Sequence, residues 1–299
     1  CGILRGLGDS LSALVYLLVA TVLNIVLDVW FVAGLHMEVA GVALATVIAQ
    51  LVSAILCMLK LRKMTALFDM KKEYLRPDKK NIFTVIRLGL PSGLTQAIFS
   101  LAMVVVQSLT NSFGEMIIAA NVIIMRVDGF AMMPNFSFGT ALTTYAGQNV
   151  GAKLYDRVKK GAWQGTLIAV CTSAVITGLI LLFGPYLMGI FTNTQELAQL
   201  SADMMKILAV GYIAMAVTQS LSGIMRGAGD TVTPMWISLL TTVAVRVPLA
   251  YGLVYLTRTA QLPQGRYESL WISLLTSWVL GALITFVFYK AGRWKKKAL

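Results

Sequence analysis

Eight long runs of apolar residues dominate this 299-residue chain. Each run has about 20 residues or more, the length that a helix needs to cross the roughly 30 Å hydrocarbon layer of a bilayer. Strands of a membrane barrel would instead alternate apolar and polar residues over about 10 positions. The sequence therefore predicts an all-α, polytopic membrane protein with spans at residues 11–33, 39–59, 90–112, 117–145, 164–188, 201–223, 233–256 and 269–290.

The charged residues are few and unevenly placed. They make up 13% of the chain, against about 25% in soluble domains, which excludes an ordinary cytosolic enzyme and a disordered chain. Of the 25 Lys and Arg residues, 20 lie at the two chain ends and in every second connection, and two lie in the other connections. By the positive-inside rule both ends are cytoplasmic. The net charge of +12 is then explained by the orientation of the chain in a bacterial plasma membrane, and we expect no nucleic-acid partner.

The longest polar stretch is residues 60–89, with nine basic residues. We interpret it as a cytoplasmic linker between two helices at 1–59 and a larger helical unit at 90–299 with a basic cytoplasmic tail. The basic segments also favour anionic lipid.

A short motif occurs twice. Residues 4–10 (LRGLGDS) and 225–231 (MRGAGDT) share four of seven positions, and six predicted spans separate them, so both copies lie on the same side of the membrane. The offset of 221 residues predicts two parallel repeats of six helices, with about four helices preceding this chain. We interpret the two turns, and a Gln-Asn-x-Gly sequence, as structural elements: Arg5, Gly6, Gly8, Asp9, Gln148, Asn149, Gly151, Arg226, Gly227, Gly229 and Asp230.

Asp128 is the strongest candidate for a binding residue, because a charge inside a membrane span is costly and marks function by default. At helical spacing it shares a face with Asn121, Met125, Met132 and Asn135. A carboxylate there can attract a cationic compound or exchange a proton, and flexible Met side chains suit ligands of many shapes. The alternative is that Asp128 only pairs with Arg126 or Arg246 to hold helices together.

Other polar residues inside the spans are weaker candidates. Arg126 either binds an anionic group or neutralises Asp128, and Gln96 either lines a cleft or bonds two helices. We favour a structural role for Arg246, whose guanidinium can satisfy a carbonyl that Pro248 frees. Asn24 and Asp28 lie on one face of the first span and support an ion site or an interhelical hydrogen-bond cluster. The single His36 cannot build a histidine metal site, and we expect no metal or cofactor.

The ordered motifs resemble the MATE (multidrug and toxic compound extrusion) family of transporters. They are LRGLGD at 4–9, NIVLD at 24–28, GVALAT at 41–46, GLP at 89–91, GQNVGA at 147–152 and RGAGDT at 226–231. The run RVDGFAMMP at 126–134 is similar to the bacterial branch related to DinF and Firmicute pumps. The resemblance implies a V-shaped pair of six-helix bundles that exports cationic or amphipathic drugs in exchange for H⁺ or Na⁺. This chain would hold the last two helices of the first bundle and the complete second bundle.

The resemblance also implies differences from the NorM branch, which carries acidic residues on the seventh and tenth helices of the full-length protein. In this chain the seventh helix corresponds to the span 90–112, which carries Gln96 and Ser100, and the tenth corresponds to the span 201–223, which has Ala216. A NorM-type cation site in the second bundle is therefore not expected. We therefore assign Asp128, Asn121, Met125, Met132, Asn135, Gln96 and Arg126 to substrate binding, with Asp28 and Asn24 supporting ion coupling.

Three alternatives remain at this point. A lipid-linked oligosaccharide flippase of the same superfamily would line its cavity with several basic residues, but only Arg126 and Arg246 lie deep in the spans. A membrane enzyme would need a nucleophilic, acid–base or metal cluster, and the sequence offers none. A truncated, non-functional product would lack the four preceding helices. We expect a drug-like small molecule as the substrate and a monomer as the full-length state.

Overall fold

The computed structural model describes residues 1–64 and 77–296, and within them the chain forms two compact units, Cys1–Ile82 and Phe83–Leu299. Residues 65–76 of the predicted linker and 297–299 of the basic tail lie outside the described residues. Parts of the predicted 60–89 linker are helical, because α3 runs to Lys63 and α4 begins at Lys79.

The first unit is a helical hairpin. A single turn precedes two long antiparallel helices, and a π-helical turn ends the first of them. Small buried residues at Ala13, Ala45 and Ala49 let the two long helices pack closely, as is common between membrane helices. The elements are α1 (Gly2–Gly6), α2 (Ser10–Val29), η1 (Trp30–Gly34) and α3 (Glu38–Lys63).

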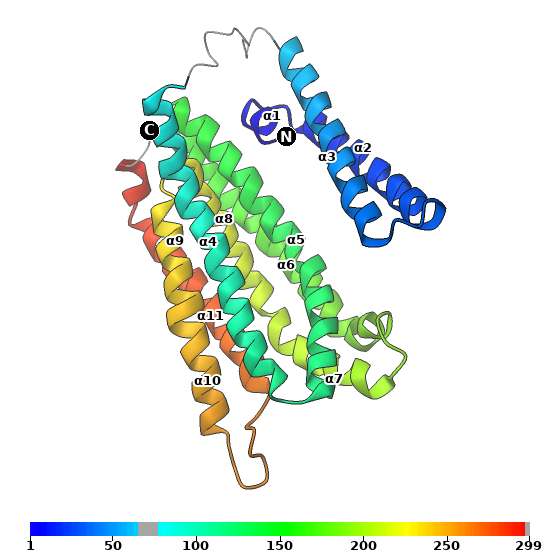
Figure 1. The fold of residues 1–299 in the computed structure, drawn as a ribbon. Coiled ribbons are helices and arrows are strands. Elements are labelled where there is room, and N and C mark those ends of the chain that lie inside the picture. Colours follow the sequence, from blue (N-terminus) through cyan, green and yellow to red (C-terminus); the bar gives the residue numbers. More distant parts are fainter. Residues whose placement is uncertain (65–76, 297–299) are drawn as a thin grey trace. The chain divides into compact units, whose positions relative to one another are not determined.

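The second unit is a bundle of long helices (Figure 1). Its elements are α4 (Lys79–Asn111), α5 (Glu115–Gly151), α6 (Tyr155–Gly189), α7 (Gln195–Ala209), α8 (Gly211–Gly227), α9 (Val232–Ser238), η3 (Leu239–Arg246), α10 (Val247–Leu256), α11 (Glu268–Lys290) and η4 (Arg293–Lys296). The start of α6 and the end of α11 lie at the end of the bundle that we predict to be cytoplasmic, and the α10–α11 loop lies at the other end.

The predicted number of membrane spans is confirmed for the described residues. Seven segments are long and apolar enough to cross a membrane by themselves, and α7 with α8 forms an eighth that is bent by 44°. The span predicted as an unbroken helix at 201–223 is therefore two helices that meet at Val210.

A second irregularity interrupts the span Val232–Leu256. Its middle, η3, is a π-helix that ends at Arg246, two residues before Pro248. Proline has no N–H group, and its ring clashes with the carbonyl four residues earlier in a regular α-helix. The wider π-helical turn relieves this clash, and such turns are frequent at functional sites.

The repeated Arg-Gly-x-Gly-Asp turns have the same backbone geometry. Gly8 and Gly229 have φ values of 93° and 92°, a region that glycine enters without strain. The N–H groups of Asp9 and Asp230 each donate 2.9 Å hydrogen bonds to the carbonyl five residues earlier, which closes the preceding helix in a Schellman motif. The two units thus share a local structure as well as a sequence motif.

Both aspartates then cap the next helix. Asp9 accepts hydrogen bonds from the backbone and hydroxyl of Ser12, and Asp230 accepts the equivalent pair from Thr233. These hydrogen bonds, with Lys60 at 3.4 Å, hold the pKa of Asp9 below its usual range. The turns therefore end one helix and begin the next within a few residues.

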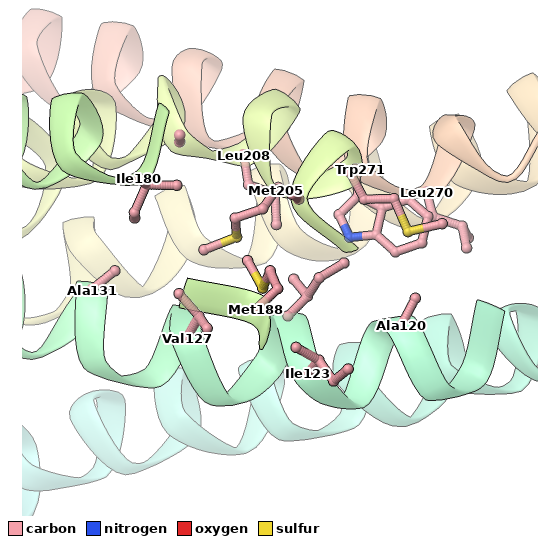
Figure 2. Packing of buried hydrophobic residues seen from close by; sticks show 14 of the residues in the cluster. Ala120, Ile123, Val127, Ala131, Ile180, Met188, Met205, Leu208, Leu270 and Trp271 are labelled. Atoms are coloured by element: carbon pink, nitrogen blue, oxygen red, sulfur yellow. The ribbon is translucent and has the colours of Figure 1, made fainter. Parts of the chain in front are cut away.

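The main core of the second unit lies between α5, α6, α7, α8 and α11. Figure 2 shows Ile123 and Val127 of α5 opposite Met188 of α6 and Met205 of α7, with Trp271 of α11 beside them. This packing buries one face of α5, and the adjacent face of α5 lines a cavity.

Glycines set the distance between α5 and α8. A Cβ added at Gly223 would collide with the carbonyl of Gly139, and one added at Gly227 would collide with the carbonyl of Thr143. Backbone-to-backbone approach of this kind is the typical use of small residues between membrane helices. Gly227 of the repeated motif thus allows close packing of α8 on α5.

Candidate functional site

A cavity of about 520 Å³ runs along the inside of the second unit, between α4, α5, α8, α11 and the span that contains η3. It is the natural candidate site, because ligand sites in helical bundles are concave and mostly apolar with a few polar groups. Helix α4 approaches the other helices less closely than most of them approach one another, and its residues form one wall of the cavity.

Asp128 lines this cavity from the middle of α5. Its carboxylate accepts a 2.8 Å hydrogen bond from the hydroxyl of Tyr212, a fully buried residue on the first turn of α8. The Tyr212 ring packs on Trp278 with 5.8 Å between ring centroids, and its hydroxyl lies 3.8 Å from the sulfur of Met205. The donor is therefore held in place from two sides.

The break between α7 and α8 positions Tyr212 for this contact. Breaking a helix inside a membrane leaves carbonyl groups without their usual partners, which costs free energy unless other groups donate to them. Here Thr177 of α6 donates to the carbonyl of Ala209, in the last turn of α7, at 2.7 Å. Asn135 of α5 adds a 3.3 Å hydrogen bond to the carbonyl of Tyr212 in the first turn of α8. Gly211 allows the ring of Trp278 to lie against the break, where a Cβ would collide with it.

Arg246 brings a positive charge to the same cavity. The residue is only 6% exposed, and both of its terminal nitrogens approach the sulfur of Met103 on α4, at 3.9 and 3.8 Å. It attracts Asp128 electrostatically, but within the described residues the two form no direct ion pair, and the Arg246 Nε atom has no hydrogen-bond partner. The expected bond from this guanidinium to a carbonyl freed by Pro248 is not among its contacts.

The structure brings five of the predicted substrate-binding residues to the cavity: Asp128, Asn121, Met125, Met132 and Gln96. Asn121 donates to Gln107 of α4 at 3.0 Å and approaches the sulfur of Met125 at 3.6 Å. The cavity wall therefore alternates amide, thioether and carboxylate groups along α5.

Two of the predicted residues lie elsewhere. Asn135 is 0% exposed and bonds to Tyr212 and to the hydroxyl of Ser173, which donates at 2.8 Å. Arg126 is exposed on another face of α5 and does not line the cavity. Beyond Asp128 the lining positions of α5 advance in steps of four, through Met132, Phe136 and Thr140. Each step turns the lining face by about 40°, so a residue seven positions from Asp128 no longer faces the cavity.

Sequence reasoning missed Tyr212, which donates to Asp128 from behind the cavity wall, and Arg226, whose side chain lines the cavity. Tyr212 stands in an apolar run, and only its place next to a glycine hinted at a helix break. Arg226 was interpreted as part of a structural turn, but its side chain reaches the cavity and lies 3.5 Å from where a Cβ of Gly139 would be. The cavity thus holds two guanidinium groups and the carboxylate of Asp128.

In the first unit, Asn24 of α2 donates to Thr46 of α3 at 3.4 Å. One carboxylate oxygen of Asp28 is buried and has no partner in the part of the chain that the structure describes. Among the same residues no group of three His, Cys, Asp or Glu side chains is close enough to hold a metal ion. Asn24 therefore links α2 to α3, and Asp28 offers a buried carboxylate oxygen that no group in the described part of the chain fills.

Comparison with known proteins gives the fold and the site a context. A family model described as MatE matches residues 91–252, more than half of the chain. The chain belongs to the MatE family. Proteins of this family are membrane transporters, which agrees with the predicted all-α, multi-pass architecture.

Two curated relatives match nearly the whole chain. It is 28% identical over 99% of its length to the probable multidrug resistance protein YoeA of Bacillus subtilis, and 25% identical over 99% to the probable multidrug resistance protein NorM of Thermotoga maritima. The chain spans 64% and 63% of these relatives' lengths.

The fold also matches that of a solved structure. A crystal structure of MATE in the straight conformation superposes with a TM-score of 0.89 at 23% identity, over 98% of this chain and 65% of that one. The family resemblance predicted from the sequence motifs is confirmed.

Proposed function

We propose that the complete protein, of which this chain is a part, exports cationic or amphipathic compounds in exchange for H⁺ or Na⁺ by alternating access. The observation that carries this proposal is the Asp128 carboxylate, held by Tyr212 inside a 520 Å³ cavity whose wall includes two thioethers of α5. The relatives' names, probable multidrug resistance proteins, support the same class of substrate.

The carboxylate has two roles in the proposed cycle. When ionised, it attracts the positive group of a compound that enters the cavity, while Met125 and Met132 adapt to its apolar part. When it takes up a proton, this attraction ends and the compound is released. A ligand can shift a conformational equilibrium only through different affinities for its states, and Tyr212 ties the state of Asp128 to the broken span α7–α8.

The positive charges restrict which compounds bind. Arg246 faces Asp128, and Arg226 lines the same cavity, so a ligand that approaches the carboxylate also meets guanidinium groups. We propose that preferred substrates carry one positive group and an extended apolar body. Asp28 and Asn24 support the ion site in the first unit in this proposal, since one buried carboxylate oxygen of Asp28 has no hydrogen-bond partner among the described residues.

Drug resistance of cells that express the full-length protein tests the proposal. Asp128→Asn keeps the shape of the side chain and removes its charge, and we expect it to abolish most resistance to ethidium at unchanged expression. Asp203→Asn is the matched control, because Asp203 lies on α7 and pairs with Lys206 at 2.7 Å outside the cavity. Wild-type resistance of the Asp128→Asn variant would overturn the role of this carboxylate.

A further inference from the structure

A second hollow lies on the outside of the bundle, separate from the cavity of Asp128. It encloses about 540 Å³ between α6 on one side and α11 with η4 on the other, and residues of α8 form its floor. We call it the α6–α11 groove. Its lining residues include Lys159, Trp163, Thr166, Phe286, Lys290 and Lys295. It lies at the end of the unit where α6 begins and α11 ends, which we predict to face the cytoplasm (Figure 1).

Lysines surround the mouth of this groove. The Lys290 ammonium lies 5.0 Å from the centre of the Phe286 ring, and that of Lys295 lies 5.7 Å from the centre of the Trp294 ring. Such cation–π contacts hold the charges over the groove. Lys159 completes the rim and pairs with Asp156 at 2.9 Å. Three positive charges against one negative charge make the rim complementary to an anion.

Below the rim the groove becomes apolar, with one exception. Trp163 is 69% exposed, and Leu167 and Val170 continue the same wall. The hydroxyl oxygen of Thr166 is buried and lacks a hydrogen-bond partner among the residues that the structure describes. An unsatisfied buried hydroxyl is destabilising, and this one lies two helical turns, about 10 Å, below Lys159.

This order of groups matches the layers of a phospholipid. Charged lysines lie where a phosphate would be, a free hydroxyl lies at the depth of the glycerol esters, and apolar side chains follow where the acyl chains begin. Basic residues next to the cytoplasmic leaflet attract anionic lipid. A soluble anion would satisfy the lysines but would leave the apolar wall uncovered.

We propose that the α6–α11 groove binds a phospholipid with an anionic headgroup. The phosphate contacts Lys159, Lys290 and Lys295, the ester region accepts a hydrogen bond from Thr166, and an acyl chain lies along α6. A lipid in this position links α6 to α11 across α8, the helix that carries Tyr212.

Lipid retention by the purified full-length protein tests this proposal. The protein is exchanged into mixed micelles that contain equal amounts of phosphatidylglycerol and phosphatidylcholine, and its bound lipids are measured by native mass spectrometry. We expect retention of phosphatidylglycerol over phosphatidylcholine. The triple variant Lys159→Gln, Lys290→Gln, Lys295→Gln should lower this preference at least about tenfold, and Lys290→Gln alone about fivefold. Lys160→Gln is the matched control, because Lys160 is exposed next to Lys159 but does not line the groove.

Further arms separate the occupants. Thr166→Val should weaken retention of both lipids, because both have ester oxygens, and should leave the preference for the anionic headgroup unchanged. Equal retention of the two lipids, or a triple variant with the preference of the wild type, would overturn the proposal. Displacement by millimolar inorganic phosphate would show a free-anion site, and a dimer whose formation excludes lipid would show that a second copy covers the groove. Either result also overturns the proposal.

Discussion

The hydroxyl of Tyr212 donates a 2.8 Å hydrogen bond to the carboxylate of Asp128 and so joins the first turn of α8 to the middle of α5. This contact depends on the break at Val210, where α7 and α8 meet at 44°. The carboxylate that we assign to substrate binding and the break in the α7–α8 span are therefore one structural unit.

Removal of the donor should weaken this unit without unfolding the bundle. Tyr212→Phe keeps the ring that packs on Trp278 and deletes the O–H group. A hydrogen bond to a charged group contributes about 1.5–3 kcal/mol, so we expect ethidium transport by the full-length protein to fall about tenfold or more. The thermal midpoint should change by only a few degrees. Tyr186→Phe, at an 80% exposed position near the end of α6, should transport like the wild type. Unchanged transport in Tyr212→Phe would show that the hydroxyl has no part in it.

The charge of Arg246 should limit the affinity for cations. Arg246→Met removes a positive charge that faces Asp128 and replaces a guanidinium whose Nε has no partner within the described chain. Because a repulsive charge is lost, we expect ethidium to bind about tenfold more tightly, equal to about 1.4 kcal/mol. Fluorescence titration of the purified full-length protein measures this.

Arg126→Met is the control for that titration, since Arg126 is exposed outside the cavity. Its affinity for ethidium should equal that of the wild type. A similar gain of affinity in both variants would mean that net charge, and not the position of Arg246, determines cation binding.

We expect the hydrogen bond to the Ala209 carbonyl at the helix break to stabilise the protein. Thr177→Val removes the hydroxyl that donates to Ala209 at 2.7 Å and keeps the shape of the side chain. Interhelical hydrogen bonds of this kind contribute about 1 kcal/mol, so the thermal midpoint should fall by a few degrees. Thr172→Val is the control, because the Thr172 hydroxyl donates to the carbonyl of Ile168 on its own helix at 2.9 Å. Equal midpoints for the two variants would argue against stabilisation of the break by α6.

Close packing of α5 on α8 should make Gly223 intolerant of substitution. Gly223→Ala places a methyl group against the carbonyl of Gly139 and should destabilise the protein by several degrees in a thermal unfolding assay. Gly178→Ala meets nothing within 4 Å and gains helix propensity, so it should be neutral or stabilising. If Gly223→Ala is as stable as Gly178→Ala, the two helices do not need this close approach.

The sequence was sufficient for those features that depend on local length, composition and spacing. All eight spans follow from apolar length, and the paired turns at Gly8 and Gly229 follow from a motif that specifies its own backbone. Features that depend on how helices cross were not predictable in this way. The break at Val210 is contacted by Thr177, which donates to Ala209, and by Trp278, which lies against Gly211, and these residues belong to α6 and α11.

The same reason explains the errors in the predicted face of α5. A constant direction along the helix included Asn135, whereas the cavity follows Phe136 and Thr140 because the lining face turns along α5. Arg226 was assigned to a turn from its motif, and only the packing of α8 on α5 shows that its side chain reaches the cavity.

The central claim is that Asp128 couples an ion gradient to movement of a cationic compound. Ethidium transport by the full-length protein in proteoliposomes, under an imposed pH or Na⁺ gradient, tests it most directly. We predict that one of the two gradients drives transport by the wild type and by Asp203→Asn, and that neither drives it in Asp128→Asn at equal incorporation. Transport by Asp128→Asn at the wild-type rate under the same gradient would contradict the account.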